Sequence, residues 1–121
     1  MIFVNIKRMS IKIQDRLIIT TKKNKKILVA DSDLQESGNW HDVQEFINEE
    51  HDNWRLPSID ELELMYEQLH LKGKGKFKQG QYWSGTEESP HHVFYINFKD
   101  GLFSDALKIM GANARLVKGA E

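Results

Sequence analysis

The densest group of side chains that could do chemistry lies late in the chain. Glu87 and Glu88 are followed closely by His91 and His92, and hydroxyl groups stand nearby at Ser84, Thr86 and Ser89. Carboxylates and imidazoles serve as general acids and bases, and Zn²⁺ binds both. A hydrolytic site also needs a nucleophile within reach, and a histidine metal site needs three or four converging ligands. The pattern supports two interpretations: a small hydrolase or metal-dependent enzyme, or a solvated turn between two strands, which is favoured.

Three other polar segments have a chemical and a structural interpretation. Asp31 and Asp33 stand one residue apart as in a calcium loop, but the glycine and terminal glutamate of an EF-hand are missing, so a turn is favoured. The segment 72–80 is rich in glycine and lysine, but it lacks the Gly-Lys-Ser/Thr ending of a Walker A loop and is interpreted as a mobile surface loop. The lysines of residues 22–26 are interpreted as a solvated hairpin tip rather than an anion site.

Aromatic residues give candidates for a contact surface. Tyr82 and Trp83 precede the histidine cluster, and large rings supply much of the energy at binding hot spots. The alternative is that both rings are core residues, and for Trp83 this alternative is favoured. Trp40 and Trp54 are assigned to the core.

Composition limits the class of protein. The 121 residues fit one domain, and a net charge of −1 gives no reason to expect nucleic acid as a partner. The chain has no cysteine, which excludes a disulfide framework, a thiolate metal site and a cysteine nucleophile. No apolar run approaches the roughly 20 residues of a membrane-spanning helix, and residues 1–8 do not resemble an export signal. We therefore expect a cytoplasmic protein with no membrane partner and no cofactor.

The strongest local signals lie in residues 54–62. Pro57 cannot continue a helix from its N-terminal side, and it favours an extended Leu56. Ser58 with Glu61 predicts a capping box, so a helix should begin here. Its apolar stripe consists of Leu62, Met65, Tyr66 and Leu69. We expect the Arg55 guanidinium to fork onto a carboxylate and backbone carbonyls and so lock this turn, rather than to bind an anion.

Other elements follow from periodicity and turn signals. A second helix should start at Gly38-Asn39 and end near residues 50–53. Asp100-Gly101 predicts a hairpin whose return begins at residues 102–104, and residues 106–112 are expected to be an irregular connection. The remaining predicted strands are 11–20, 27–30, 81–86, 92–98 and 114–118.

The order of these motifs resembles the DUF1566 family, also described as the C-terminal domain of the Legionella collagen-like adhesin. The resemblance spans roughly residues 40–119, while residues 1–36 match only loosely. The signature residues are Trp40, Trp54, Arg55, Leu56, Pro57, Ser58, Glu61 and Arg115, together with the segments Tyr82–Glu87 and Tyr95–Phe98.

The resemblance implies an α+β fold of the C-type-lectin-like type, with two helices flanking twisted, mostly antiparallel sheets in a single domain of residues 1–121. It implies a non-catalytic binding module whose partner is a protein or a glycan, contacted through the late loops 72–81, 87–92 and 104–113. Calcium motifs of sugar-binding lectins are absent, and the related formylglycine-generating activity requires cysteines. Family members are often exported, which contrasts with the cytoplasmic location expected here.

One departure from the family leads to a structural expectation. Members often carry cysteines at the positions that align with Ile47 and Leu116, and both are aliphatic here. We expect the two side chains to be buried neighbours that replace a disulfide by an apolar contact.

Overall fold

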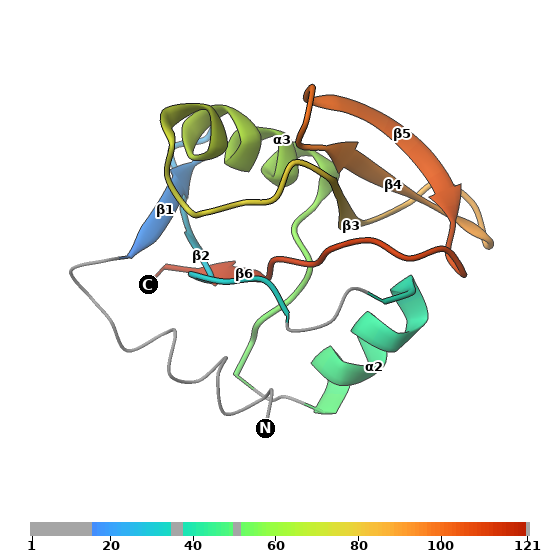
Figure 1. Ribbon diagram of the computed structural model, residues 1–121. Helices are drawn as coiled ribbons and strands as arrows, with labels where there is room; N and C mark the ends of the chain where they lie inside the picture. Colours follow the sequence, from blue (N-terminus) through green and yellow to red (C-terminus); the bar gives the residue numbers. More distant parts are fainter. Residues whose placement is uncertain (1–15, 35–37, 50–51, 121) are drawn as a thin grey trace.

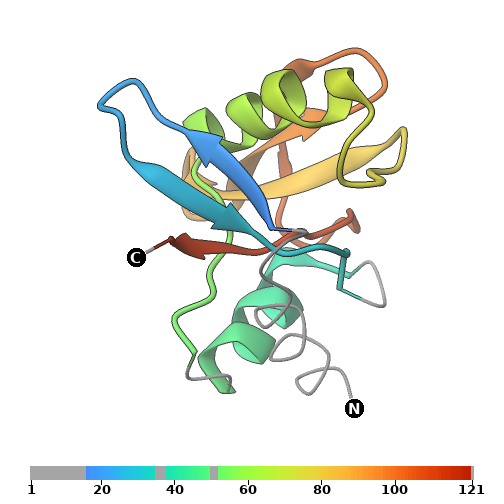
Figure 2. The same cartoon turned by 90° about the vertical axis from the view of Figure 1, so that its left-hand side faces the viewer.

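Two helices and two three-stranded antiparallel sheets make up the protein (Figure 1). The structure is a computed structural model that describes residues 16–34, 38–49 and 52–120. The helices are α2 (Trp40–Glu49) and α3 (Ile59–Gln68), and a short 3₁₀ helix, η1 (His70–Lys72), follows α3. They lie on opposite sides of the strands (Figures 1 and 2). The α+β class expected from the sequence is confirmed.

The first sheet joins the two ends of the described chain. Strand β1 (Leu17–Thr20) and strand β2 (Lys26–Val29) form a hairpin whose turn contains Asn24 at a positive φ of 64°, as the lysine-rich segment predicts. Strand β6 (Val117–Gly119) pairs antiparallel with β2, so the order is β1-β2-β6 (Figure 2). The part of the first predicted strand before residue 16 lies outside the described residues.

The predicted capping box at the start of α3 is confirmed. The Ser58 hydroxyl accepts from the Glu61 amide at 3.1 Å, and the Glu61 carboxylate accepts from the Ser58 amide at 2.9 Å. The helix then buries Leu62 and Met65 against the strands, because these residues recur on one face of the helix. The predicted fork of Arg55 onto a carboxylate is also present, with Glu61 as its partner.

The second sheet is formed by strands β3 (Gln81–Glu87), β4 (His92–Asn97) and β5 (Leu102–Leu107), in that order. The hairpin predicted at Asp100-Gly101 joins β4 to β5. The prediction of an irregular connection over residues 106–112 was wrong for Ala106 and Leu107. Both belong to β5, because all six residues of β4 pair with a residue of β5 and the last two pairs use Ala106 and Leu107. The last strand also starts later than predicted, at Val117 instead of residue 114.

Two apolar clusters fill the interior. One surrounds Trp40, Trp54 and Trp83, and the other gathers residues of α3, β1 and β2 around Tyr82 and Phe98. Both tryptophans assigned to the core, Trp40 and Trp54, are therefore core residues. No helix in the described ranges is long and apolar enough to cross a membrane.

Leu116 is buried in the tryptophan cluster, and Ile47 packs against the same cluster. The two aliphatic side chains therefore border one apolar cluster, and a direct contact between them stays a prediction. Ile47 differs from the expectation in being only partly buried, although it shares a helix face with the buried Trp40 and Val43.

A buried polar network joins the two clusters. Arg115 is 1% exposed, and its Nε donates to Asp33 Oδ1 at 2.7 Å. Its two terminal nitrogens donate to the carbonyls of Ala30 and Gly75, and its guanidinium lies 4.1 Å from the ring centre of Phe77. The Asp33 carboxylate therefore has a structural role, and the buried Phe77 anchors the segment that the sequence suggested was a mobile loop.

Candidate functional site

Strand pairing between β4 and β5 decides which side chains share a face. Residues opposite each other in an antiparallel pair point to the same side. Three such pairs are His92 with Leu107, Phe94 with Asp105, and Ile96 with Phe103. Ile96 belongs to the cluster that contains the α3 residues Leu62 and Met65, so these six side chains point to the side on which α3 lies.

Helix α3 packs against β3 and β4, where it covers Ile96, and it leaves Phe103 and Leu107 of β5 uncovered. Phe103 is 64% exposed and Leu107 is 42% exposed, and Phe94 is half-buried. The Phe94 and Phe103 rings meet edge to face, with their centroids 6.0 Å apart. We call the uncovered part the outer β4–β5 face, formed by His92, Phe94, Phe103, Asp105 and Leu107.

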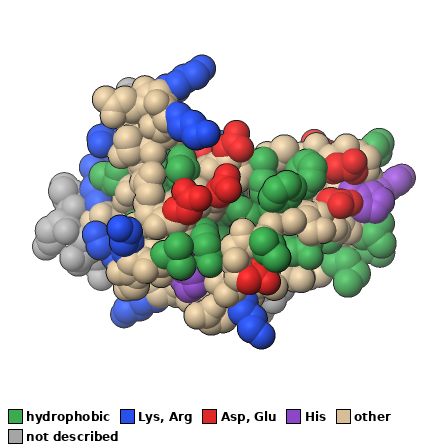
Figure 3. Space-filling view, turned by 90° about the horizontal axis from the view of Figure 1, so that it is seen from above, with side chains coloured by type: hydrophobic (Ala, Val, Ile, Leu, Met, Phe, Trp, Pro, Cys, Tyr) green, Lys and Arg blue, Asp and Glu red, His purple; other side chains and the backbone are tan. Residues whose placement is uncertain are grey.

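Exposed apolar side chains continue beyond this face. Large exposed apolar residues crowd into the nine positions from 102 to 110: Leu102, Phe103, Leu107, Ile109 and Met110. Seen from above, hydrophobic, acidic and histidine side chains lie side by side on one end of the surface (Figure 3). Scattered exposed apolar residues are normal, but a contiguous group is typical of an interaction site.

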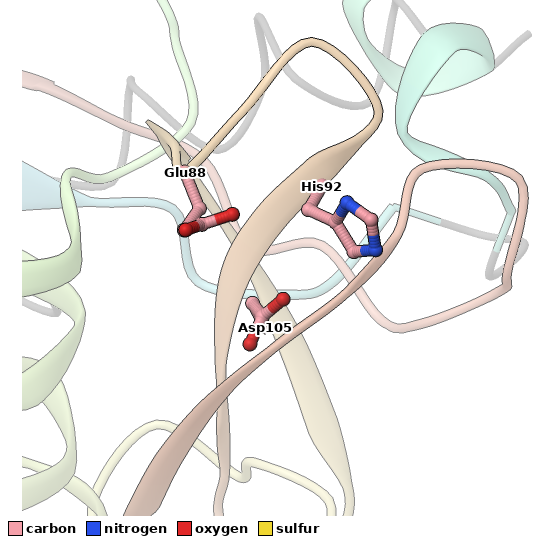
Figure 4. A group of neighbouring side chains, drawn as sticks. All are labelled: Glu88, His92 and Asp105. Carbon is pink, nitrogen blue, oxygen red and sulfur yellow. The ribbon is translucent and has the colours of Figure 1, made fainter.

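Three side chains with metal-ligand chemistry converge beside the outer face. The Glu88 amide donates to the His92 carbonyl at 3.0 Å, which sets Glu88 opposite β4. Ligand atoms of Glu88, His92 and Asp105 all lie within 4.8 Å of one another. Figure 4 shows the two carboxylates turned toward each other with the His92 ring beside them. Two carboxylates and an imidazole can bind a divalent cation or a basic group.

The structure divides the four titratable residues singled out in the sequence. It brings Glu88 and His92 together, but Glu87 pairs with Val93 on the opposite side of the sheet, where it forms an ion pair with Lys108. His91 is exposed and lies outside the cluster. Consecutive strand residues point to opposite faces, so neighbours in sequence need not share a site.

Sequence reasoning missed Asp105. It follows the Asp100-Gly101 hairpin, and the hairpin register sets it diagonally across from His92. Counting back along the return strand from that turn is the signal that could have found it, because a two-strand register fixes which residues face each other.

The two aromatic candidates for a contact surface are not at the surface. Tyr82 is 0% exposed and Trp83 is 1% exposed. The Tyr82 hydroxyl donates to Asp33 at 2.8 Å, and the Trp83 indole donates to the Gly38 carbonyl at 2.8 Å. Burial, and then the Asp33 carboxylate, raise the pKa of Tyr82 well above its usual value, so the hydroxyl stays protonated. The core interpretation is the one that the burial supports.

The remaining signature residues lie in the frame of the fold rather than at the outer face. Leu56 is buried, Pro57 accepts a backbone hydrogen bond from Gly85, and the Thr86 hydroxyl accepts from the Ile59 amide. These contacts fix the start of α3 against β3. The signature residues therefore stabilise the fold, and the candidate site is formed by other residues.

β5 is also an edge strand. It pairs with β4 on one side, and within the described ranges no strand pairs with its other side. Natural edge strands are often protected by charged residues, especially lysine, or by proline; β5 contains neither lysine nor proline, and Asp105 is its one charged residue. Its main-chain donors and acceptors, together with its apolar side chains, can accept an added strand.

No protein-family model matches the chain, and no characterised protein sequence is detectably similar to it.

Proposed function

We propose that the protein is a non-catalytic binding module that docks an extended segment of a protein partner along β5. The observation that carries this proposal is an edge strand that continues into an exposed apolar stretch, which includes the exposed side chains of Phe103 and Ile109. In strand addition, main-chain hydrogen bonds supply affinity, and alternate side chains supply specificity.

The scaffold we propose is C-type-lectin-like and related to the DUF1566 family. Support comes from the α+β make-up, with two helices and two antiparallel sheets, and from the order of the motifs around Trp54–Leu62. In such a fold the late strands and loops carry the binding surface, and the outer β4–β5 face lies there.

The charged side chains around β5 indicate which side chains a partner strand should carry. The surface around β5 carries the carboxylates of Glu88, Asp100 and Asp105, all exposed. Lys108 is buried and is already paired with Glu87. A partner strand that alternates apolar and basic side chains fits this surface, because its apolar residues cover Phe103 and Leu107 while its cations meet the carboxylates.

A protein partner is favoured over a glycan for a physical reason. Sugars are recognised chiefly through polar groups and flat aromatic faces, whereas Leu107, Ile109 and Met110 offer flexible or branched apolar surface with few polar atoms. Met in particular adapts to varied apolar partners.

A displayed library of random extended peptides tests the proposal. Selection on the wild-type protein should enrich peptides that alternate apolar and basic residues. The variants Phe103→Asp and Leu107→Asp should weaken binding of an enriched peptide at least tenfold, since each puts a charge where an apolar side chain docks. Leu71→Asp is the matched control, because Leu71 is 62% exposed and lies in η1, away from β5.

Three results would overturn the proposal. Selection could enrich no peptide, or the enriched peptides could bind the Phe103→Asp and Leu71→Asp variants equally well. Binding to a glycan array that is lost in Phe103→Asp, with no peptide binding, would assign the same face to a sugar instead. Dimerisation lost in Phe103→Asp, again with no peptide binding, would make the partner a second copy of the chain.

A further inference from the structure

The geometry points to a divalent metal site, best suited to Zn²⁺, formed by Glu88, His92 and Asp105. This inference does not depend on the docking of a partner along β5. It rests on the convergence of three side chains from three segments: the turn after β3, strand β4 and strand β5.

The spacing of the ligand atoms is close to what zinc requires. Four-coordinate zinc with bonds of about 2.1 Å holds its ligand atoms about 3.4 Å apart. The ligand atoms lie within 4.8 Å of one another, so the widest pair has to close by at most about 1.4 Å. Glu88 and Asp105 are exposed and can make this movement by side-chain rotation alone.

Charge balance also favours a cation at this place. Glu88 and Asp105 face each other, and in the described part of the chain neither forms an ion pair with a lysine or arginine. Glu87, the neighbour of Glu88, does have such a partner in Lys108. Two like charges brought together repel, and a divalent cation between them removes that repulsion.

His92 is oriented by a group outside the cluster. Its Nδ1 lies 3.0 Å from the Ser89 hydroxyl. In the tautomer with the proton on Nδ1, the ring donates to Ser89, and Nε2 carries the lone pair. Figure 4 shows Nε2 turned away from the two carboxylates, so the His92 ring has to turn about its side-chain bonds before Nε2 can bind a metal that Glu88 and Asp105 share. A hydrogen bond to the second ring nitrogen is the usual companion of a histidine ligand, since it fixes the tautomer.

The donor set selects the class of metal. One imidazole and two carboxylates suit Zn²⁺, whereas Mg²⁺ and Ca²⁺ prefer oxygen ligands alone. Three protein ligands leave at least one position for water or for a group of another molecule. The site therefore holds an accessible ion at the border of the outer β4–β5 face.

Isothermal titration with ZnCl₂ on the untagged, chelator-treated protein tests the inference. We expect one Zn²⁺ per chain in the wild type. His92→Gln and Asp105→Asn should each raise the dissociation constant for Zn²⁺ at least tenfold, because each removes a ligand. The matched control is His91→Gln, which alters the adjacent, exposed histidine outside the cluster and should leave binding unchanged.

Zinc should also raise the melting temperature of the wild type and of His91→Gln, but not of His92→Gln, since a ligand that binds only the folded state stabilises it. Circular dichroism spectra of all variants check that each is folded. The inference fails if the wild type takes up no Zn²⁺ at 1 mM ZnCl₂ (about the weakest affinity of interest), if His91→Gln and His92→Gln lose binding equally, or if Mg²⁺ displaces Zn²⁺ at equal concentration. Zn²⁺ would occupy two of the carboxylates that are proposed to meet a basic partner, so the peptide selection is done with EDTA present, and the two proposals can then fail separately.

Discussion

Arg55 and Glu61 form a two-pronged ion pair across the turn that leads into α3. Nη1 of Arg55 lies 2.7 Å from Oε1 of Glu61, and Nη2 lies 2.9 Å from Oε2. Nη1 also donates to the Leu56 carbonyl at 3.2 Å. The carboxylate that caps the helix is therefore held by a side chain from before the proline, so one group fixes both the helix start and the approach of the chain.

Replacing Arg55 by alanine should lower the free energy of unfolding by about 1 kcal/mol. The pair has good two-pronged geometry, but the Arg55 side chain is 45% exposed and solvent screens the attraction. Chemical denaturation measures this change. Peptide binding by the folded Arg55→Ala protein should match the wild type, because the turn is hydrogen-bonded to β3 and β6 and not to β5. Unchanged stability would contradict the structural role.

The same carboxylate predicts a pH dependence. Partial burial by itself would raise the pKa of Glu61, but the hydrogen bonds from Arg55 and from the Ser58 amide, with the Arg55 charge, hold it below its usual value. A group with a lowered folded pKa stabilises the protein above its unfolded pKa, about 4.3, and this stabilisation is lost as the pH falls through the folded pKa. The difference in free energy of unfolding between the wild type and Glu61→Gln should be constant above about pH 6 and should shrink toward zero below about pH 4. A gap that does not change over this range would refute the assignment.

Arg115→Met should cost about 3–5 kcal/mol of stability, because it leaves the largely buried Asp33 carboxylate without its cation. The double variant Arg115→Met with Asp33→Asn should recover part of that loss, since the unpaired charge is gone. Thermal or urea denaturation of the two single variants and the double variant measures the coupling. Strictly additive effects would mean that the ion pair does not matter.

The two core tryptophans Trp40 and Trp54 give a matched comparison. The Trp40 indole donates to the Ser84 carbonyl at 2.9 Å, whereas Trp54 Nε1 has no hydrogen-bond partner in the described part of the chain. Trp40→Phe should cost about 1–3 kcal/mol more than Trp54→Phe, because only the first removes a donor from a buried carbonyl. If urea denaturation gives equal losses in the free energy of unfolding for the two variants, the loss depends on ring volume alone and not on the hydrogen bond.

Two glycines at positive φ separate backbone strain from steric conflict. A Cβ on Gly101 would lie 2.5 Å from the Tyr66 ring, while a Cβ on Gly73 would meet nothing within 4 Å. Gly73→Ala should cost about 1 kcal/mol for the left-handed conformation alone. Gly101→Ala should cost at least about 1 kcal/mol more, because Tyr66 must also move. Equal melting temperatures for the two variants would contradict this.

Local signals in the sequence predicted the start of α3 and the β4–β5 hairpin well. Ser58, Glu61 and Arg55 lie within seven positions, so their contacts follow from capping chemistry and turn geometry alone. The Asp100-Gly101 turn likewise depends only on backbone preferences of adjacent residues.

The site was less predictable, because its members meet through strand pairing. Asp105 joins His92 only once the register of β4 and β5 is known, and Glu87 and Glu88 separate because strand neighbours face opposite ways. The exposed Phe103 and Leu107 would pass in the sequence for core residues of a strand. Arg115 and Asp33 are 82 positions apart, and no local pattern announces their contact.

The pairing of β6 with β2 has a consequence for the order of events during synthesis. Residues Ile27 and Val29 emerge from the ribosome about 90 residues before their partners Gly119 and Val117. Closing so long a loop is slow, and until then the β1–β2 hairpin keeps an unpaired edge and apolar side chains in solvent. We expect nascent chains stalled before Val117 to be protease-sensitive and to bind chaperones, and resistance to appear only when β6 has emerged.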